Sequence, residues 1–140
     1  MKVLLAVDGS AYSKRMLAYL AAHEELLGNH HQFTAITVLP SLPSVAEVYA
    51  DPDQVRKSLL EEAEGILRPV RSFAEQKKWA LDSLILEGDP ARAIAQHAEG
   101  GEYDLLIMGC HGHSPLAGLI LGSVSTKVLA QCRTPVLLIR

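Results

Sequence analysis

The chain has 140 residues, of which 49% are hydrophobic, and its 13 basic and 16 acidic side chains give a formal net charge of −3. This length suits one domain around a buried core, so we expect residues 1–140 to form a single unit. The charge balance offers no basic footprint for nucleic acid or an anionic membrane, and no run of 18 apolar residues predicts a transmembrane helix.

Apolar runs and helical patterns alternate from the first residues onward. Residues 3–7 are apolar up to Asp8, a run that is too short for a signal sequence and typical of a strand buried on both faces. A helix should follow and end near Gly28. Residues 33–39 predict a second strand, and residues 40–50 predict a loop.

Two acid–proline pairs, Asp51-Pro52 and Asp89-Pro90, mark helix starts, each with an acidic N-cap and proline at the first helical position. The first of these helices is long, and Pro69 inside it predicts a kink or a break. The second should end at Gly100-Gly101. Between the two helices, residues 84–86 predict a third strand.

The last third of the chain continues the alternation. Residues 105–108 predict a fourth strand, residues 123–131 a helix and Val136–Ile139 a fifth strand. The alternation predicts an α/β fold: a single doubly wound five-stranded parallel sheet with helices on both faces, Rossmann-like or flavodoxin-like, with strand order 3-2-1-4-5. Such sheets bind ligands at the carboxyl ends of their strands, where Asp8 and Gly109 stand in this sequence.

Three glycines recur where the fourth strand gives way to the last helix. Two residues separate Gly109 from Gly112, and nine residues separate Gly112 from Gly122, which directly precedes Ser123. A helix that opens at Ser123 offers unpaired backbone N–H groups and the positive end of its dipole to an anion. The spacing therefore predicts a phosphate cradle; the alternative is that Gly109 and Gly112 serve only a tight turn.

The pattern G-x2-G-x9-G-S closely resembles the universal stress protein family in its nucleotide-binding form. The resemblance also rests on residues 7–10 after the first strand and residues 135–139 at the end, and it covers the whole chain. It implies an ATP-binding, cytoplasmic stress-response module. The positions that it implies for the nucleotide are Ala6, Asp8, Val38, Gly109, Gly112, His113, Gly122, Ser123, Val124 and Ser125.

The resemblance also implies what these residues do. Ala6 and Asp8 would lie beside the base and ribose, and Val38 would meet the adenine through its backbone. The first two glycines would let the loop wrap the ribose and phosphates. Residues 122–125 would hold the phosphates through N–H groups and hydroxyls. A homodimer is implied as well, in which the last strands, Val136–Ile139, pair antiparallel; as an edge strand this segment is physically suited to such pairing.

One departure from the family pattern concerns charge. The position after Gly112 is often basic in the family and is His113 here, and no Lys or Arg lies between Glu102 and Lys127. The phosphates would then rely on backbone N–H groups, hydroxyls and a bound Mg²⁺ or Mn²⁺. If His113 contacts a phosphate, affinity should rise as the pH falls through the titration range of the imidazole.

Several residues have simpler interpretations. Asp8 could only cap the first helix, although Ser10 is the expected cap. His111 and His113 lack the further ligands that a tetrahedral metal site needs, so we assign no metal site. The two cysteines, Cys110 and Cys132, fit a reduced compartment and are expected to be small buried residues rather than reactive thiols.

Three functions remain open from the sequence: a nucleotide-binding regulatory module, a slow ATPase, and a partner-binding dimer whose pocket is empty. Strong hydrolysis is disfavoured, because the loop has no Lys or Arg and no acid is evidently placed to orient water. We assign no catalytic residue. The P-loop pattern G-x4-G-K-[ST] is absent, which excludes a P-loop enzyme.

Overall fold

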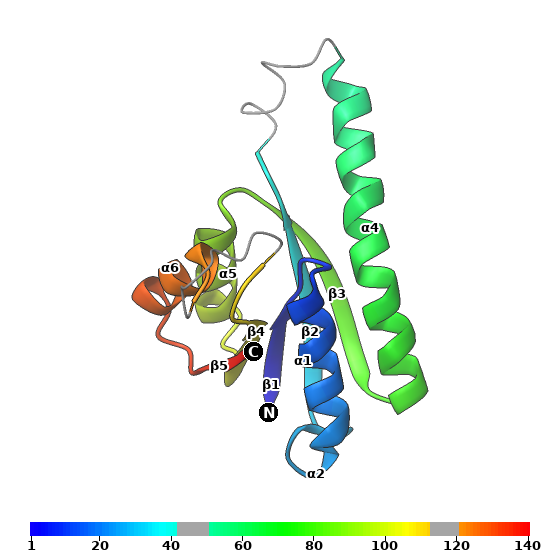
Figure 1. Cartoon of the computed structure of the whole chain (residues 1–140), viewed down its shortest axis with the longest axis vertical. Helices are drawn as coiled ribbons and strands as arrows, with labels where there is room; N and C mark the ends of the chain where they lie inside the picture. Colours follow the sequence, from blue (N-terminus) through cyan, green and yellow to red (C-terminus); the bar gives the residue numbers. More distant parts are fainter. Residues whose placement is uncertain (42–50, 113–120) are drawn as a thin grey trace.

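A five-stranded parallel sheet forms the centre of the structure, a computed structural model that describes residues 1–41, 51–112 and 121–140. The strands are β1 (Lys2–Ala6), β2 (Gln32–Leu39), β3 (Ala80–Glu87), β4 (Leu105–Gly109) and β5 (Val136–Ile139). Their spatial order is β3-β2-β1-β4-β5, and every pairing is parallel (Figure 1). The predicted fold class and strand order are confirmed.

The helices lie on both faces of this sheet. They are α1 (Ala11–Ala22), α2 (Glu24–Leu27), α4 (Pro52–Lys77), α5 (Pro90–Gly100) and α6 (Ser123–Gln131). Buried residues of α1 and α4 share one hydrophobic cluster, and those of α5 and α6 share another. Figure 1 shows the same division, with α1 and α4 on one side of the sheet and α5 and α6 on the other.

Strand β1 shows why its sequence is apolar throughout. Val3 and Leu5 belong to the cluster of α1 and α4, while Leu4 and Ala6 belong to the cluster of α5 and α6. Side chains alternate across a strand, so a central strand that is covered on both faces needs apolar residues at every position. The continuous run places β1 at the middle of the sheet.

Helix α4 is a single element. The Asp51 side chain caps it by accepting hydrogen bonds from the N–H groups of Asp53 at 3.1 Å and Gln54 at 3.3 Å. Of the predicted kink or break at Pro69, the break is wrong, because the helix continues through this residue to Lys77. Leu67 and Val70, on either side of Pro69, are buried against the sheet. Their burial, worth about 1.5–3 kcal/mol each, offsets the roughly 3 kcal/mol cost of a helical proline.

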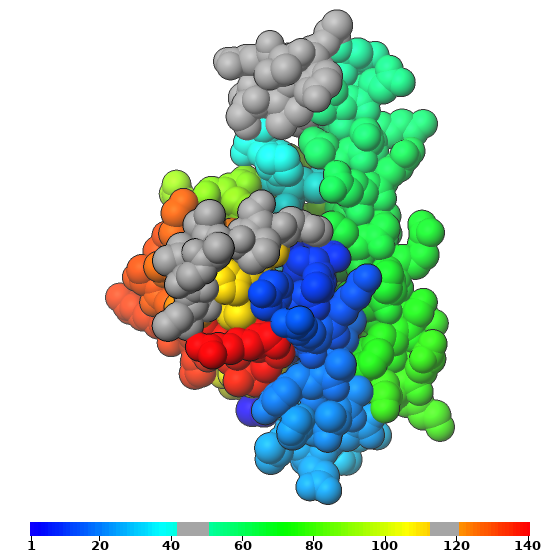
Figure 2. All heavy atoms as spheres, in the orientation of Figure 1, coloured from blue at the N-terminus to red at the C-terminus, as the bar shows by residue number. Residues whose placement is uncertain are grey.

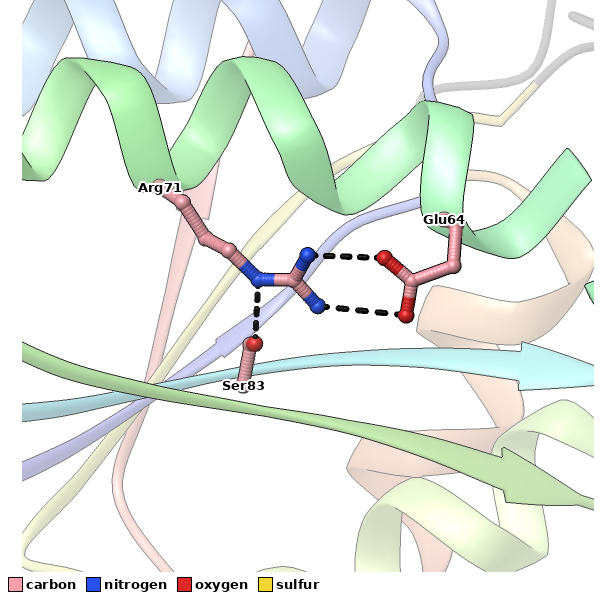
Figure 3. A network of polar contacts seen from close by, with 3 residues as sticks. All are labelled: Glu64, Arg71 and Ser83. Atoms are coloured by element: carbon pink, nitrogen blue, oxygen red, sulfur yellow. Dashed lines mark hydrogen bonds and ion pairs between the residues drawn. The ribbon is translucent and has the colours of Figure 1, made fainter. Parts of the chain in front are cut away.

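A polar contact ties the outer side of α4 to the edge strand β3 (Figure 3). The Arg71 guanidinium donates to both carboxylate oxygens of Glu64, at 2.7 and 3.3 Å, and its Nε donates to Ser83 Oγ at 2.7 Å. The hydrogen bond from Arg71 lowers the pKa of Glu64, and Glu64 in turn raises the pKa of Arg71. Through Arg71, these bonds join α4 to β3 at the edge of the sheet.

The first predicted helix is wrong in one respect. It is divided at His23 into α1 and the short α2, which ends at Gly28 as expected. The last helix and last strand have their predicted bounds. Within the described residues, no helix combines the length and the apolar composition needed to cross a membrane.

Candidate functional site

A cavity of about 320 Å³ lies at the carboxyl ends of β1, β2 and β4. Nine of the ten residues predicted from the sequence line it: Ala6, Asp8, Val38, Gly109, Gly112, Gly122, Ser123, Val124 and Ser125. The tenth, His113, lies outside the described residues. The structure therefore brings residues from four separate segments of the chain to one place: 6–8, 38, 109–112 and 122–125.

Asp8 follows β1, and its carboxylate is fixed by the first turn of α1. Its Oδ1 accepts hydrogen bonds from the N–H of Ser10 and from the hydroxyl of Ser13, both at 2.9 Å. The backbone N–H of Asp8 donates to Ser13 Oγ at 3.1 Å. These reciprocal bonds hold the carboxylate in one orientation at the edge of the cavity. The expected side-chain cap by Ser10 is not made, and its buried Oγ has no hydrogen-bond partner among the described residues.

Two glycines of the motif allow parts of the protein to approach one another closely. A Cβ added to Gly109 would lie 2.6 Å from Cβ of Tyr12, and one added to Gly112 would lie 2.7 Å from Oδ2 of Asp8. Figure 2 shows the yellow segment that contains β4 beside the dark blue segment that leads into α1. The need for glycine at these two positions is thus explained by contacts within the protein.

The N-terminus of α6 forms the polar end of the cavity. Its N-cap, Gly122, has no side chain to cap the helix, and the first helical bond runs from Thr126 N to Gly122 O at 3.0 Å. The N–H groups of residues 123–125 precede that bond and have no helical acceptor. N–H groups without a helical acceptor and the helix dipole together make this end suited to an anion.

The Ser125 hydroxyl makes hydrogen bonds within the protein. It donates towards the carbonyl groups of Cys110 at 2.9 Å and Gly109 at 3.1 Å. The N–H of Gly122 also donates to the Cys110 carbonyl, at 2.7 Å. These bonds tie the glycine loop to α6. The backbone N–H of Ser125, in the first turn of α6, has no acceptor within the helix.

The other end of the cavity is apolar. It is lined by side chains from strands on one side and α5 on the other: Ala6, Ile36, Val38, Pro90, Ile94 and Met108. A slot of this composition suits a flat, apolar ring, because aromatic surfaces gain most from burial against aliphatic side chains. The whole cavity thus combines an apolar slot, an oriented carboxylate and an anion-binding helix end.

Charge is sparse in this cavity. Asp8 is the one carboxylate in its described lining, which contains no Lys or Arg. His111 lines it too, with a buried Nδ1 that has no hydrogen-bond partner in the part of the chain that the structure describes. Across the same described ranges, no group of three His, Cys, Asp or Glu side chains could hold a metal ion. Cys110 is buried, Cys132 is partly exposed, and both are free thiols.

Sequence reasoning missed eight lining residues: Val7, Ser13, Ile36, Thr37, Pro90, Ile94, Met108 and His111. Most are apolar and give no signal that separates them from core. Two could have been found. Ser13 is in the first helical turn after Asp8, where hydroxyl groups commonly bond to preceding residues. His111 lies inside the glycine motif itself.

Comparison with known protein sequences identifies the family of this chain. The sequence model of the universal stress protein family matches residues 1–140. The chain belongs to the universal stress protein family. A universal stress protein of Thermus aquaticus is 34% identical over 140 residues, which cover 99% of this chain and 97% of the relative. The universal stress protein YxiE of Bacillus subtilis is 32% identical over 147 residues, covering 99% of this chain and 98% of the relative.

Solved structures agree with the fold of this universal stress protein. MJ0577, a universal stress protein of Methanocaldococcus jannaschii, superposes with a TM-score of 0.83 at 26% identity and covers 99% of this chain and 94% of its own. Three family structures at 20–23% identity, with TM-scores of 0.67–0.73, are complexes with cAMP, AMP (Arabidopsis thaliana) and dAMP (Archaeoglobus fulgidus). At this identity they show the fold alone.

Proposed function

We propose that this universal stress protein binds ATP, or a related adenine nucleotide, in the cavity and acts as a nucleotide-dependent regulatory module in stress response. One observation carries the proposal. A single cavity joins an apolar slot, an oriented carboxylate at Asp8, and the unpaired N–H groups at the start of α6. In their chemistry, these three parts match the base, the ribose and the phosphates of a nucleotide.

The proposed roles follow the lining. The adenine lies in the apolar slot beside Ala6, with the Val38 backbone at its edge. Asp8 faces the ribose, since a carboxylate accepts hydrogen bonds from hydroxyl groups. Residues 122–125 receive the phosphates at the start of α6. The three family structures with cAMP, AMP and dAMP have the same fold, and they support an adenine nucleotide as the ligand.

A divalent cation would accompany ATP in this proposal. No Lys or Arg stands in the sequence between Glu102 and Lys127, so the phosphate charge needs another partner. Mg²⁺ typically keeps several waters and binds through phosphate oxygens rather than a cage of protein ligands. That mode fits a lining whose one described carboxylate, Asp8, is already held by Ser13.

Holding the nucleotide is favoured over hydrolysing it. Phosphoryl transfer needs positive charge at the transferred group and a residue that orients water. The described lining supplies neither a Lys nor an Arg. We expect phosphate release from ATP over several hours to stay at the level of a protein-free control; steady release that depends on the protein would favour the slow ATPase.

The test of nucleotide binding adds a negative charge at the start of α6. The helix accepts this charge, but it would repel a bound phosphate. Ser123→Glu places a carboxylate at the exposed first position of α6, where the helix dipole favours it. Gln131→Glu adds the same charge at the exposed end of the same helix, about 12 Å away. Calorimetric titration with ATP, AMP and adenosine, each with Mg²⁺, compares the two variants with the parent protein.

We expect Ser123→Glu to weaken ATP and AMP at least roughly tenfold, about 1.4 kcal/mol, and to leave adenosine unchanged. Gln131→Glu should change none of the three ligands. Equal affinities in both variants would place the phosphates elsewhere. If the parent protein binds none of the ligands at millimolar concentration, the partner-binding dimer with an empty pocket is the better function.

We also propose a homodimer through the edge of β5. This strand pairs only with β4 among the described strands, and Figure 2 shows its end, in red, at the surface. Unpaired N–H and C=O groups along an edge strand favour pairing with a second copy. Sedimentation should give twice the chain mass of 15.2 kDa at micromolar concentration. A single-chain mass at every concentration would contradict this assembly.

A further inference from the structure

The His111 side chain lies at the wall of the cavity. Its Nδ1 is shielded from solvent and has no hydrogen-bond partner among the described residues. Buried polar side-chain atoms in proteins are nearly always paired, and an exception calls for a specific cause. The ring itself lines the cavity, together with Gly112 and Gly122. A bound ligand is therefore the natural source of the missing partner.

Packing fixes where this nitrogen lies. The His111 ring rests against Tyr12 of α1, with ring centroids 5.2 Å apart and planes tilted by 50°. The Nδ1 atom itself lies 3.5 Å from the position that a Cβ of Gly122 would occupy. Gly122 is the N-cap of α6. The nitrogen thus stands next to the helix end whose N–H groups have no helical acceptor.

The residues around the His111 ring add no other nitrogen donor to the described lining of the cavity. The ionisable groups around the ring are Tyr12, with Arg15 over its outer face at 5.2 Å, Cys110 in the same loop, and Asp8 across Gly112. None of them adds a cationic group to the described lining of the cavity, and α6 has no acid in its first turn. His111 is the one described lining side chain with a nitrogen donor.

We infer that Nδ1 of His111 donates a hydrogen bond to the phosphate oxygen that the N–H groups of α6 bind. His111 thereby selects phosphorylated adenine ligands over adenosine. The inference rests on the proposed function, because it places the phosphate at α6. It assigns the nitrogen donor of the site to His111, within the described part of the motif. A purely structural role, in which the ring only packs against Tyr12, predicts no such selectivity.

Side-chain isosteres separate the two roles. The amide nitrogen of asparagine is as many bonds from Cα as Nδ1, so His111→Asn keeps a donor near the same position. His111→Gln moves the donor one bond further out, and His111→Phe keeps the ring without any donor. Each variant is titrated calorimetrically with AMP and with adenosine, both with Mg²⁺, and its unfolding by urea is measured beside the parent protein.

We expect His111→Gln and His111→Phe to weaken AMP roughly 10- to 100-fold, the range for a lost hydrogen bond to a charged group. Adenosine should change less than about threefold, and His111→Asn should retain AMP within a similar factor. If AMP and adenosine weaken equally, or neither changes, the inference is overturned while the proposed function stands. If the parent protein binds neither ligand, the proposed function itself has failed.

A spectroscopic measurement on the parent protein keeps the inference testable if the variants fold poorly. Long-range ¹H–¹⁵N correlation reports the two ring nitrogens of His111 separately. A new hydrogen bond at Nδ1 should shift that resonance when AMP is added and leave it in place when adenosine is added. A resonance that is unmoved by saturating AMP would show that Nδ1 does not contact the phosphate.

Discussion

Replacing Ser13 by alanine removes the hydroxyl group that orients the Asp8 carboxylate. This hydroxyl donates to Asp8 Oδ1 at 2.9 Å and accepts from the Asp8 N–H at 3.1 Å, and Ser13 is 6% exposed. A hydrogen bond to a charged group contributes about 1.5–3 kcal/mol, and a neutral one about 1 kcal/mol. The higher helix propensity of alanine offsets about 0.5 kcal/mol of this loss. The partial exposure of Asp8 lowers the loss further, because solvent weakens the hydrogen bond to its carboxylate. We expect Ser13→Ala to cost about 1–3 kcal/mol of unfolding free energy.

The same change should weaken nucleotide binding, because the carboxylate loses its fixed orientation. We expect roughly tenfold weaker AMP binding, with ribose recognition affected most. Urea unfolding measures stability, and calorimetric titration with AMP and with its 2′,3′-dideoxy analogue measures affinity. The parent protein should bind AMP more tightly than the dideoxy analogue, and this difference in affinity should be smaller in Ser13→Ala.

The matched control is Ser72→Ala, which makes the same chemical change at an exposed position inside α4. It should leave both affinities unchanged and raise stability by up to about 0.5 kcal/mol. If Ser13→Ala behaves like Ser72→Ala in both assays, the hydroxyl does not orient Asp8 and the reasoning is refuted.

Three further changes test other parts of the structure. Gly65→Ala should stabilise the protein by about 0.5–1 kcal/mol in urea unfolding, because Gly65 is inside α4 and a Cβ there meets nothing within 4 Å; a loss of stability would show an unseen contact. Ser10→Ala should leave the unfolding free energy unchanged or raise it, since the buried hydroxyl has no described partner. A loss of about 1 kcal/mol, as for an ordinary N-cap, would contradict that geometry. Burial, and then the charge of Lys2, lowers the pKa of His97. The contribution of neutral His97 to the free energy of unfolding should thus be fully present above about pH 6.5. It should fall as the pH drops towards the lowered pKa, because the unfolded chain takes up the proton first. His97→Gln should flatten this pH dependence, and an unchanged pH profile of stability would exclude His97 as its source.

Much of the fold could be predicted because single residues decide local structure. Asp51 and Asp89 cap their helices through side-chain hydrogen bonds, as the acid–proline pairs predicted. The apolar run of β1 reflects burial on both faces of the sheet. The glycine spacing located one side of the cavity, which Gly109, Gly112 and Gly122 all line.

Other features depend on contacts between distant segments. Only residues 84–86 resembled a strand, yet β3 runs from Ala80 to Glu87, since it pairs with the full length of β2. As an edge strand it alternates exposed and partly buried residues, which weakens the apolar signal. The same holds at the site. The hydrogen bond from Ser13 to Asp8 depends on how α1 lies against the end of β1, and the bond from Ser125 to Cys110 depends on how α6 lies against the end of β4.

The central claim is that the cavity between Asp8 and α6 holds the nucleotide. Amide ¹H–¹⁵N spectra recorded during titration with AMP test this most directly. We expect the largest shifts at Ser123, Val124 and Ser125, whose N–H groups would meet the phosphate, with smaller shifts beside Asp8. Shifts confined to another face of the molecule, or no shifts at millimolar AMP, would contradict the account.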